Sequence, residues 1–289
     1  MEDSRKRVEA ILDKEMIASL HIPLLREAIQ LAFKGGKRLR PMISLNIASA
    51  LGSPYNIDKI AIVSELIHTA SLIIDDLPCM DNDTIRRGNP TIHHKYGETR
   101  AQILTMFMFS KVYHLLHQGF KELADAGLSD ADHRRHIVFT TLSHNLGILG
   151  APMGQYLDTC GNTSTKSTPP TEEIWYRDLI HKKTSTLFEI AFILGYVAGG
   201  GDLQHLDYLR QCAHSFGIAF QISDDFQDTA KDASRPFCPN FVNHLGKTRA
   251  LEVFYECMNQ CDTLLDTIGI HTKWFKELQK LLLRRVRTR

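Results

Sequence analysis

Residues 57–76 read IDKIAIVSELIHTASLIIDD. Apolar residues recur in this segment at three- and four-residue spacing, which is typical of a helix that packs one face against a core. The helix is expected to run straight into Asp75 and Asp76, and Pro78 then breaks it. The segment therefore predicts a buried helix that ends in an acidic cluster on a turn, Asp75-Asp76-Leu-Pro-Cys-Met-Asp81-Asn-Asp83.

The same periodicity recurs over most of the chain, at about residues 99–118, 133–160, 172–198, 203–229 and 241–267. No stretch alternates like an exposed strand, and no Asn-Gly or Asp-Gly pair marks a hairpin. A chain of 289 residues with 43% hydrophobic content can bury a large core. We expect an all-α fold, a single-domain antiparallel bundle of roughly ten to twelve helices.

Composition excludes several classes of function. The net charge is only +1, so nothing global indicates a nucleic-acid partner. The six cysteines show no CxxC spacing and are expected to be reduced, mostly buried thiols of a cytoplasmic protein. The first residues mix charges throughout and lack an apolar signal core. No run approaches the roughly 20 apolar residues that a membrane span needs.

A second acidic cluster, Asp224-Asp225-Phe-Gln-Asp228, begins 224 − 75 = 149 positions after the first. Asp224 and Asp228 are four apart and share one face of a helix. Carboxylates gathered beside apolar helices need a counter-charge, and Mg²⁺ binds through a few carboxylates together with substrate phosphates. Arg86 and Arg87 follow the first cluster after two intervening residues. The two clusters predict a magnesium–diphosphate site; the alternative is that each is a solvated helix end.

Further basic and polar residues fit such a site. The glycine-flanked turn Gly35-Gly36-Lys37-Arg38-Leu39-Arg40-Pro41 opens a helix, and Lys37 and Arg40 could clamp one phosphate group. His68 lies two helical turns before Asp75 on roughly the same face. Lys183 and Thr184 interrupt an otherwise apolar helical stretch. Taken singly, the turn could be a basic surface feature and His68 a core histidine.

Four segments together resemble the trans-isoprenyl diphosphate synthases. They are GGKRLRP, DDLPCMDND with RRGNPT, KKTSTLFE and FQISDDFQD, in this order and spacing, over about residues 30–250. Four residues separate the opening pair of the first motif from Asp81, and DDLPCMDND is especially similar to the geranylgeranyl type. The resemblance implies one polyprenyl synthase domain over residues 1–289, an isoprenoid-synthase bundle around a central substrate cavity, and a homodimer.

The resemblance also implies roles for individual residues. The expected magnesium ligands are Asp75, Asp81, Asp224 and Asp228, supported by Asp76 and Asp225. They would hold about three Mg²⁺ ions, with Mn²⁺ as a substitute. Arg86 and Lys183 match the residues that hold the allylic diphosphate. The isopentenyl diphosphate pocket corresponds to Lys37, Arg40, His68 and Arg87. Thr184 and Gln221 match polar groups near the reacting carbons, and Lys231 matches a lysine that often follows the second motif.

Product length is implied by Ala70 and Ser71, five and four residues before Asp75. In the family, a bulky aromatic residue there stops growth at farnesyl. Both side chains are small here, so the expected product is geranylgeranyl diphosphate. A farnesyl or longer product stays open, because side chains of other helices could be the ones that stop growth of the prenyl tail.

Two parts of the chain leave alternatives open. The loop after Lys231 is shortened, and the lysine that the family usually carries there is missing; either Arg235 replaces it or closure over the diphosphate is weaker. The basic tail, residues 284–289, either folds over the isopentenyl site or is a solvated end.

Two other classes of protein share parts of the pattern. A regulatory subunit of a prenyl synthase heteromer usually lacks one aspartate motif, and both are whole here. A class I terpene cyclase usually carries an Asn/Asp–Ser/Thr–Glu second metal motif and lacks GGKRxRP. A synthase requires isopentenyl diphosphate, a cyclase releases hydrocarbon without it, and a regulatory subunit does neither alone.

Overall fold

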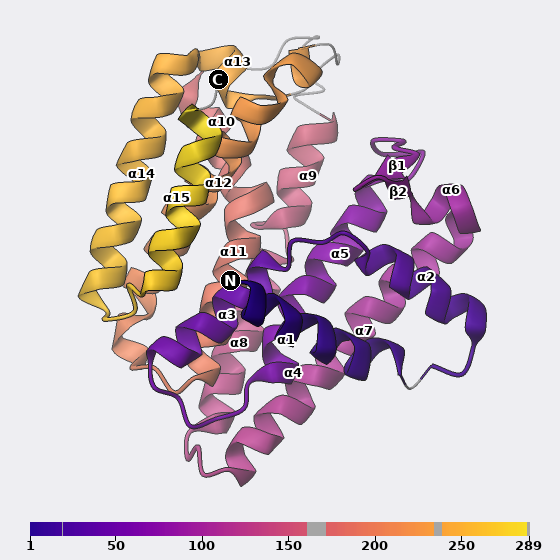
Figure 1. Cartoon of the computed structure of the whole chain (residues 1–289), viewed down its shortest axis with the longest axis vertical. Coiled ribbons are helices and arrows are strands. Elements are labelled where there is room, and N and C mark those ends of the chain that lie inside the picture. The colour runs from indigo at the N-terminus through magenta and orange to yellow at the C-terminus, as the bar shows by residue number, and fades with distance from the viewer. Residues whose placement is uncertain (19, 161–171, 234–238, 288–289) are drawn as a thin grey trace. The chain divides into compact units, whose positions relative to one another are not determined.

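The computed structural model describes residues 1–18, 20–160, 172–233 and 239–287. Its regular structure is helical apart from one two-stranded hairpin, so the predicted all-α fold is confirmed (Figure 1). The chain forms two compact units, residues 1–136 with 194–201, and residues 137–193 with 202–289. We describe each unit by itself, and one domain over the whole chain remains a prediction.

The first unit is built from helices and the hairpin. Its elements are α1 (Glu2–Leu12), a π-helical turn (Asp13–Ile17), α2 (Pro23–Phe33), α3 (Leu39–Ala50), α4 (Asp58–Ala61), α5 (Val63–Asp75), β1 (Ile85–Arg86), β2 (Asn89–Pro90), α6 (Ile92–Tyr96) and α7 (Glu98–Asp125). Helix α5 packs against α7, and its apolar positions Leu66, Ile67 and Ile73 are buried. This burial is what the spacing in residues 57–76 predicts.

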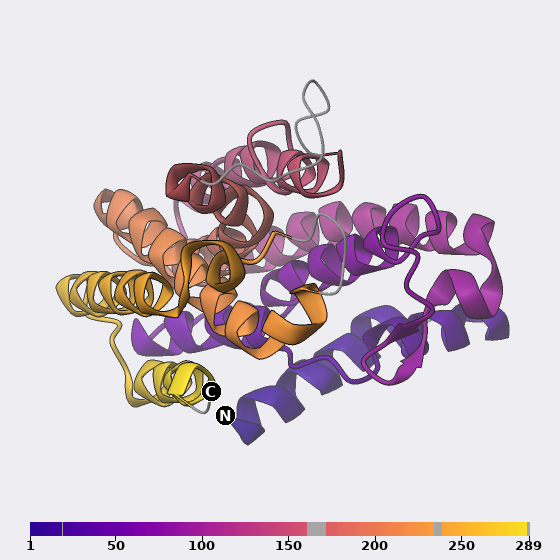
Figure 2. The same cartoon turned by 90° about the horizontal axis from the view of Figure 1, so that it is seen from above.

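The second unit is centred on a long helix. Its elements are α9 (Ala151–Cys160), α10 (Glu173–Ile180), a π-helical turn η2 (His181–Ser185), a 3-10 turn (Leu203–His205), α12 (Leu206–Ala233), α13 (Phe241–Leu245), α14 (Lys247–Thr267) and α15 (Lys273–Arg287). Helix α12 packs against α14 and α15, and Figure 2 shows these helices from above. Helices α8 (Ala131–Asn145) and α11 (Thr186–Ala198) contain residues of both units.

Three expectations need correction. The segment 133–160 is two helices, because a Cβ at Gly150 would lie 2.0 Å from the carbonyl oxygen of Asn145, and only glycine allows the chain to fold back so closely. Within the described residues there are fifteen α-helices, more than expected, since α4, α6 and α13 have only four or five residues and show no periodicity. The hairpin was not expected at all.

The hairpin has a clear local cause. Ile85 pairs with Pro90 and Arg86 with Asn89, and the two connecting residues, Arg87 and Gly88, have φ of 53° and 72°. Two residues in the left-handed region make the type I′ turn that two-residue hairpins favour. Asn-Gly is the usual signal for this turn, and arginine in its first position is uncommon. The motif RRG is therefore a tight turn that presents Arg87.

Other expectations fall on cysteines, loops and membrane spans. Cys212, Cys257 and Cys261 are buried thiols, and Cys79 is an exposed one. The loop that follows Lys231 falls mostly on residues 234–238, which lie outside the described residues, as does Arg235. In the described part of the chain, no helix combines the length and apolar character that crossing a bilayer requires.

Candidate active site

The first aspartate motif lies where α5 ends. The helix stops at Asp75, Asp76 caps it, and a turn follows that includes the exposed Pro78. The backbone N–H of Asp81 donates to the carbonyl oxygen of Asp75 at 2.9 Å. Asp75 and Asp81 are thus joined by one backbone hydrogen bond although they are six residues apart, as the helix-breaking role of Pro78 predicts.

Asp76 connects the motif to the hairpin. Its side chain is buried, and Arg86 donates to its Oδ1 from Nε at 2.8 Å and from Nη2 at 2.5 Å. Arg86 Nη2 also lies 3.3 Å from Asp83 Oδ2. Burial raises the pKa of Asp76, although the hydrogen bond from Arg86 opposes this shift. Asp76 therefore supports the site by positioning Arg86.

The two glycines of the basic turn make room for Arg87. A Cβ on Gly35, whose φ is +76°, would lie 3.3 Å from Arg87 Cβ. A Cβ on Gly36 would lie 2.7 Å from Arg87 Nη1 and 1.9 Å from Arg38 Nη1. A methyl group on Gly36 would displace both guanidinium groups, and a methyl group on Gly35 would press against the backbone and the aliphatic stem of Arg87. The glycines of GGKRLRP therefore allow Arg87 to lie against the basic turn.

Arg38 has a role that we did not predict from the sequence. It is 3% exposed, and it donates from Nε to Glu9 at 2.9 Å and from Nη1 to Glu65 at 2.7 Å. It also donates to the carbonyl oxygen of Phe33. The middle arginine of the basic turn is thus a structural ion-pair residue. The one signal in the sequence was Glu65, an acid within the apolar segment 57–76.

Among the residues that the structure describes, no hydrogen-bond partner is found for two buried nitrogen atoms of the predicted isopentenyl pocket. They are His68 Nδ1 and Arg87 Nη1. Burial and the charges of Arg40 and Arg87 lower the pKa of His68, and burial lowers that of Arg87. Arg40 is 8% exposed, whereas Lys37 is exposed at the mouth of the turn. We call Arg40, His68 and Arg87 the cationic cluster. Buried donors amid positive charge are suited to an anion.

A small cavity adjoins the cationic cluster, and the residues predicted to set product length lie on α5. The cavity has a volume of about 30 Å³, and Thr69, Asp76, Arg86 and Arg87 are among its lining residues. On α5, Ala70 is fully buried, and Ser71 Oγ donates to the carbonyl oxygen of His68 at 2.9 Å. Both small side chains therefore lie on the helix that carries His68 and Asp75.

The second aspartate motif lies on α12 in the other unit. Asp228 is exposed, and Asp224 is partly exposed. Asp225 is buried and accepts hydrogen bonds from Gln221 Nε2 and from the backbone N–H of Phe241, both at 2.8 Å. Burial raises the pKa of Asp225 to about 7. Asp225 therefore orients Gln221 and holds the start of α13, while Asp224 and Asp228 remain accessible carboxylates.

The π-helical turn η2 presents the polar residues that interrupt the apolar stretch. Thr184 Oγ1 donates to Gln221 Oε1 at 2.9 Å, and Lys183 forms an ion pair with Asp158 of α9. A Cβ on Gly154 would lie 2.3 Å from the backbone nitrogen of Lys183, so α9 approaches η2 very closely. π-Helical turns occur often at functional sites. The structure brings Thr184 and Gln221 into one hydrogen bond, and it gives Lys183 a partner in Asp158.

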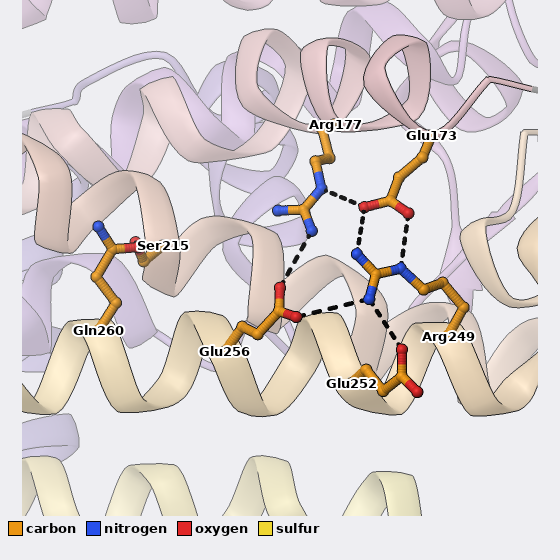
Figure 3. Close-up of polar contacts among 7 residues, drawn as sticks. All are labelled: Glu173, Arg177, Ser215, Arg249, Glu252, Glu256 and Gln260. Atoms are coloured by element: carbon orange, nitrogen blue, oxygen red, sulfur yellow. Dashed lines mark hydrogen bonds and ion pairs between the residues drawn. The ribbon is translucent and has the colours of Figure 1, made fainter.

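A network of charged residues holds α10, and thereby η2, in place (Figure 3). Arg249 of α14 binds Glu173 of α10 with two hydrogen bonds of 2.8 and 3.0 Å. Arg177 bridges Glu173 at 2.8 Å and Glu256 at 3.4 Å. Glu252 pairs with Arg249 at 2.8 Å, and Ser215 donates to Gln260 one turn further along α14 at 2.9 Å.

The donors that could hold a metal ion are carboxylates in two units. In the ranges that the structure describes, no three His, Cys, Asp or Glu side chains are grouped to hold a metal ion. Each motif does hold a cationic side chain: Arg86 at Asp76, and Arg285 at Asp224 at 2.6 Å. Oxygen-only donors that accept a cation fit Mg²⁺, which completes its shell with substrate phosphates and water. Lys231, on the last turns of α12, is exposed.

Comparisons with known proteins agree on the family. The sequence profile of the polyprenyl synthetase family matches residues 22–236. The chain is 31% identical over 269 residues to a trans-prenyltransferase of African swine fever virus, covering 89% of this chain and 76% of that protein. It is 32% identical over 250 residues to geranylgeranyl pyrophosphate synthase 3, chloroplastic, of Arabidopsis thaliana, covering 85% of this chain and 64% of that protein.

Solved structures extend the similarity to the fold. A geranyltransferase from Legionella pneumophila superimposes with a TM-score of 0.82 at 26% identity, covering 98% of this chain and 95% of that one. A geranyltransferase from Helicobacter pylori superimposes with a TM-score of 0.79 at 30% identity, covering 99% and 96%.

Proposed function

From the premise that this chain belongs to the polyprenyl synthetase family and is a trans-prenyltransferase, we infer that it condenses isopentenyl diphosphate head to tail with allylic diphosphates. The product that we favour is geranylgeranyl diphosphate. The alternatives are a farnesyl or longer-chain synthase.

The cationic cluster carries this proposal. Within the described residues, His68 Nδ1 and Arg87 Nη1 are buried without partners; a diphosphate oxygen would accept a hydrogen bond from Arg87 Nη1, and from His68 Nδ1 in the tautomer that carries its proton there. The exposed Lys37 lies at the same turn and would add a further charge. The Arg86–Asp76 pair connects this cluster to the first aspartate motif. Isopentenyl diphosphate would therefore bind at the cationic cluster, beside the first aspartate motif, which is proposed to bind the allylic diphosphate through Mg²⁺.

The proposed reaction begins when the C–O bond of the allylic diphosphate breaks. Asp75, Asp81, Asp224 and Asp228 would hold Mg²⁺, about three ions, which would act as a Lewis acid toward the leaving diphosphate. Arg86 and Lys183 neutralise the negative charge that develops on the leaving group.

The allylic cation then needs stabilisation without capture. The Thr184 hydroxyl and the Gln221 amide lie in one hydrogen-bonded pair, and Asp225 fixes the orientation of that amide. Their oxygen dipoles, together with the carbonyl of Lys183, would stabilise positive charge. The double bond of isopentenyl diphosphate attacks the cation, and the released diphosphate takes up the proton that the new cation loses, which leaves a chain five carbons longer.

Product length is proposed to depend on Ala70 and Ser71. Both are small, and they precede Asp75 on α5 by about one turn. We expect Ala70→Phe to shorten the product, because the ring would occupy the path of the growing tail. An unchanged product would mean that the tail does not pass this turn.

The proposal includes a homodimer and a cytoplasmic location. Helix α7 exposes Ile103 (58%), Met106 (71%) and Tyr113 (57%), whose spacing places them on one face. A row of exposed apolar side chains supports a protein interface. Light scattering of the wild type and of Met106→Glu tests the dimer: we expect twice the chain mass only for the wild type.

Reduced cysteines support the cytoplasmic location, although relatives carry chloroplastic and mitochondrial names.

Chain length of the product tests the function. The purified protein is incubated with Mg²⁺, labelled isopentenyl diphosphate and, separately, dimethylallyl, geranyl or farnesyl diphosphate. A twenty-carbon product supports the proposal in full. A fifteen-carbon product would support the same reaction, but it would mean that residues other than Ala70 and Ser71 limit the chain length. Hydrocarbon release without isopentenyl diphosphate would indicate a cyclase, and no incorporation would indicate a regulatory subunit.

Lys37→Ala should raise the KM for isopentenyl diphosphate much more than that for the allylic substrate.

A further inference from the structure

Arg285 lies on the last turn of α15 and contacts the second aspartate motif. Its Nη1 donates to Asp224 Oδ1 at 2.6 Å. The side chains of Arg285 and Asp224 are 26% and 34% exposed. The basic tail was expected either over the isopentenyl site or as a solvated end. Arg285 of that tail instead pairs with a predicted metal ligand 61 residues earlier in the chain.

Two more contacts fix Arg285 on α12. Its Cζ lies 5.7 Å from the centre of the Phe220 ring, a cation–π distance. Gln227 Nε2 donates to the carbonyl oxygen of Arg285 at 2.6 Å. This carbonyl belongs to the last turn of α15, so the contact ties the end of α15 to α12. Phe220, Asp224 and Gln227 are spaced at i, i+4 and i+7, so Arg285 docks along one face of α12.

The pairing has a consequence for cation binding at Asp224. A guanidinium within hydrogen-bond distance already neutralises this carboxylate, so a metal ion that binds there must compete with Arg285. A diphosphate changes the competition, because a guanidinium binds phosphate oxygens at least as well as a carboxylate. Arg285 could therefore leave Asp224 when a diphosphate is present, without losing an anionic partner.

We propose that Arg285 is a positioning residue that makes metal binding at Asp224 depend on diphosphate. The inference rests on the proposed function, in which Asp224 is a metal ligand. Without diphosphate, Arg285 holds Asp224 and keeps the affinity for metal low. When diphosphate is bound, Asp224 becomes available to the ion. The order of binding is thus built into the chain, and it opposes loading of the second motif with metal alone.

The test measures metal binding directly rather than turnover. Mn²⁺ is titrated into the purified full-length protein, and free Mn²⁺ is read by electron paramagnetic resonance, with and without inorganic diphosphate. The variants are Arg285→Ala, Arg285→Lys and the control Lys280→Ala, which removes an exposed positive charge from the same helix. Circular dichroism verifies that each variant is folded.

Without diphosphate, Arg285→Ala should bind Mn²⁺ about threefold more tightly than the wild type, the size expected for losing a competing, partly exposed ion pair. Arg285→Lys, which keeps the charge and the backbone contact to Gln227, should lie between the two. Lys280→Ala should match the wild type. With saturating diphosphate, the advantage of Arg285→Ala should disappear.

Equal or weaker Mn²⁺ binding by Arg285→Ala without diphosphate would overturn the proposal, as would an equal gain in Lys280→Ala. Asp224→Asn separates this failure from failure of the proposed function. If Asp224→Asn weakens Mn²⁺ binding and Arg285→Ala does not strengthen it, only the role of Arg285 is wrong. If Asp224→Asn has no effect on Mn²⁺ binding, Asp224 is not a metal ligand. The role of Asp224 in the proposed function is then wrong, and the role of Arg285 is wrong with it.

Discussion

Replacing Arg38 by methionine should destabilise the protein strongly, although Arg38 belongs to a motif that resembles a substrate-binding turn. Methionine keeps an unbranched apolar side chain but removes the guanidinium, so the change isolates the charge. The substitution leaves Glu65, which is 2% exposed, without the donor that lies 2.7 Å away. A buried charge that loses its partner costs about 3–5 kcal/mol.

The second partner contributes much less. The Glu9 side chain is 45% exposed, and a pair with such exposure is worth about 0.2–1 kcal/mol. We therefore expect Arg38→Met to lose about 3–4 kcal/mol of unfolding free energy, mostly through Glu65. Glu9→Gln should lose less than about 1 kcal/mol. Lys37→Ala, at the exposed neighbouring position, should leave the unfolding free energy unchanged.

The assay is urea unfolding followed by circular dichroism, with the slope checked for two-state behaviour. The double variant Arg38→Met/Glu65→Leu is the decisive comparison, because apolar replacement of a whole buried ion pair is often close to neutral. It should recover most of the loss. The reasoning is refuted if Arg38→Met loses less than about 1 kcal/mol, or if the double variant is no more stable than Arg38→Met.

Three further outcomes are expected. Gly154→Ala should cost about 1–3 kcal/mol and lower turnover, because the new methyl group would lie 2.3 Å from the backbone of Lys183; an unchanged midpoint in urea would count against this close approach. Burial lowers the pKa of His214 to about 4 from 6.5, so its stabilising neutral form is complete above pH 6.5 and is lost as the pH falls toward 4. The free energy of unfolding should therefore change less between pH 7 and pH 5 in His214→Asn than in the wild type. The difference is at most about 1.4 kcal/mol per pH unit, and it is smaller here because the ring is partly exposed; an equal pH dependence of the two proteins would contradict this. Glu173→Gln should lower the midpoint modestly at low salt and hardly at high salt, because it removes the acceptor shared by Arg177 and Arg249; a salt-independent loss would mean that packing, and not charge, holds α10.

Local sequence information predicted the helix that carries the first motif. Apolar spacing in residues 57–76, ended by Pro78, was enough to predict a buried α5 and the turn that brings Asp81 to Asp75. Helix periodicity and a proline act over a few residues, so no distant contact was needed. The same reasoning missed the hairpin at Arg87, because its turn uses an arginine where the usual signal is asparagine.

Pairing between distant residues was beyond the sequence. Three cations of similar type stand in the basic turn, and nothing local distinguishes the exposed Lys37 from the buried Arg38. Likewise, Asp224 and Asp225 are neighbours on α12, yet only Asp225 is buried, against Phe241. Which side of a helix faces a neighbour depends on where that neighbour packs.

The sequence by itself determined the helical class and the two aspartate motifs, because residue types and short spacings encode them. Only the tertiary structure decided that Arg38 pairs with Glu65 and that Arg285 pairs with Asp224. Charged side chains choose partners by distance and burial in space, and segments 27 and 61 residues apart come together only when the helices pack.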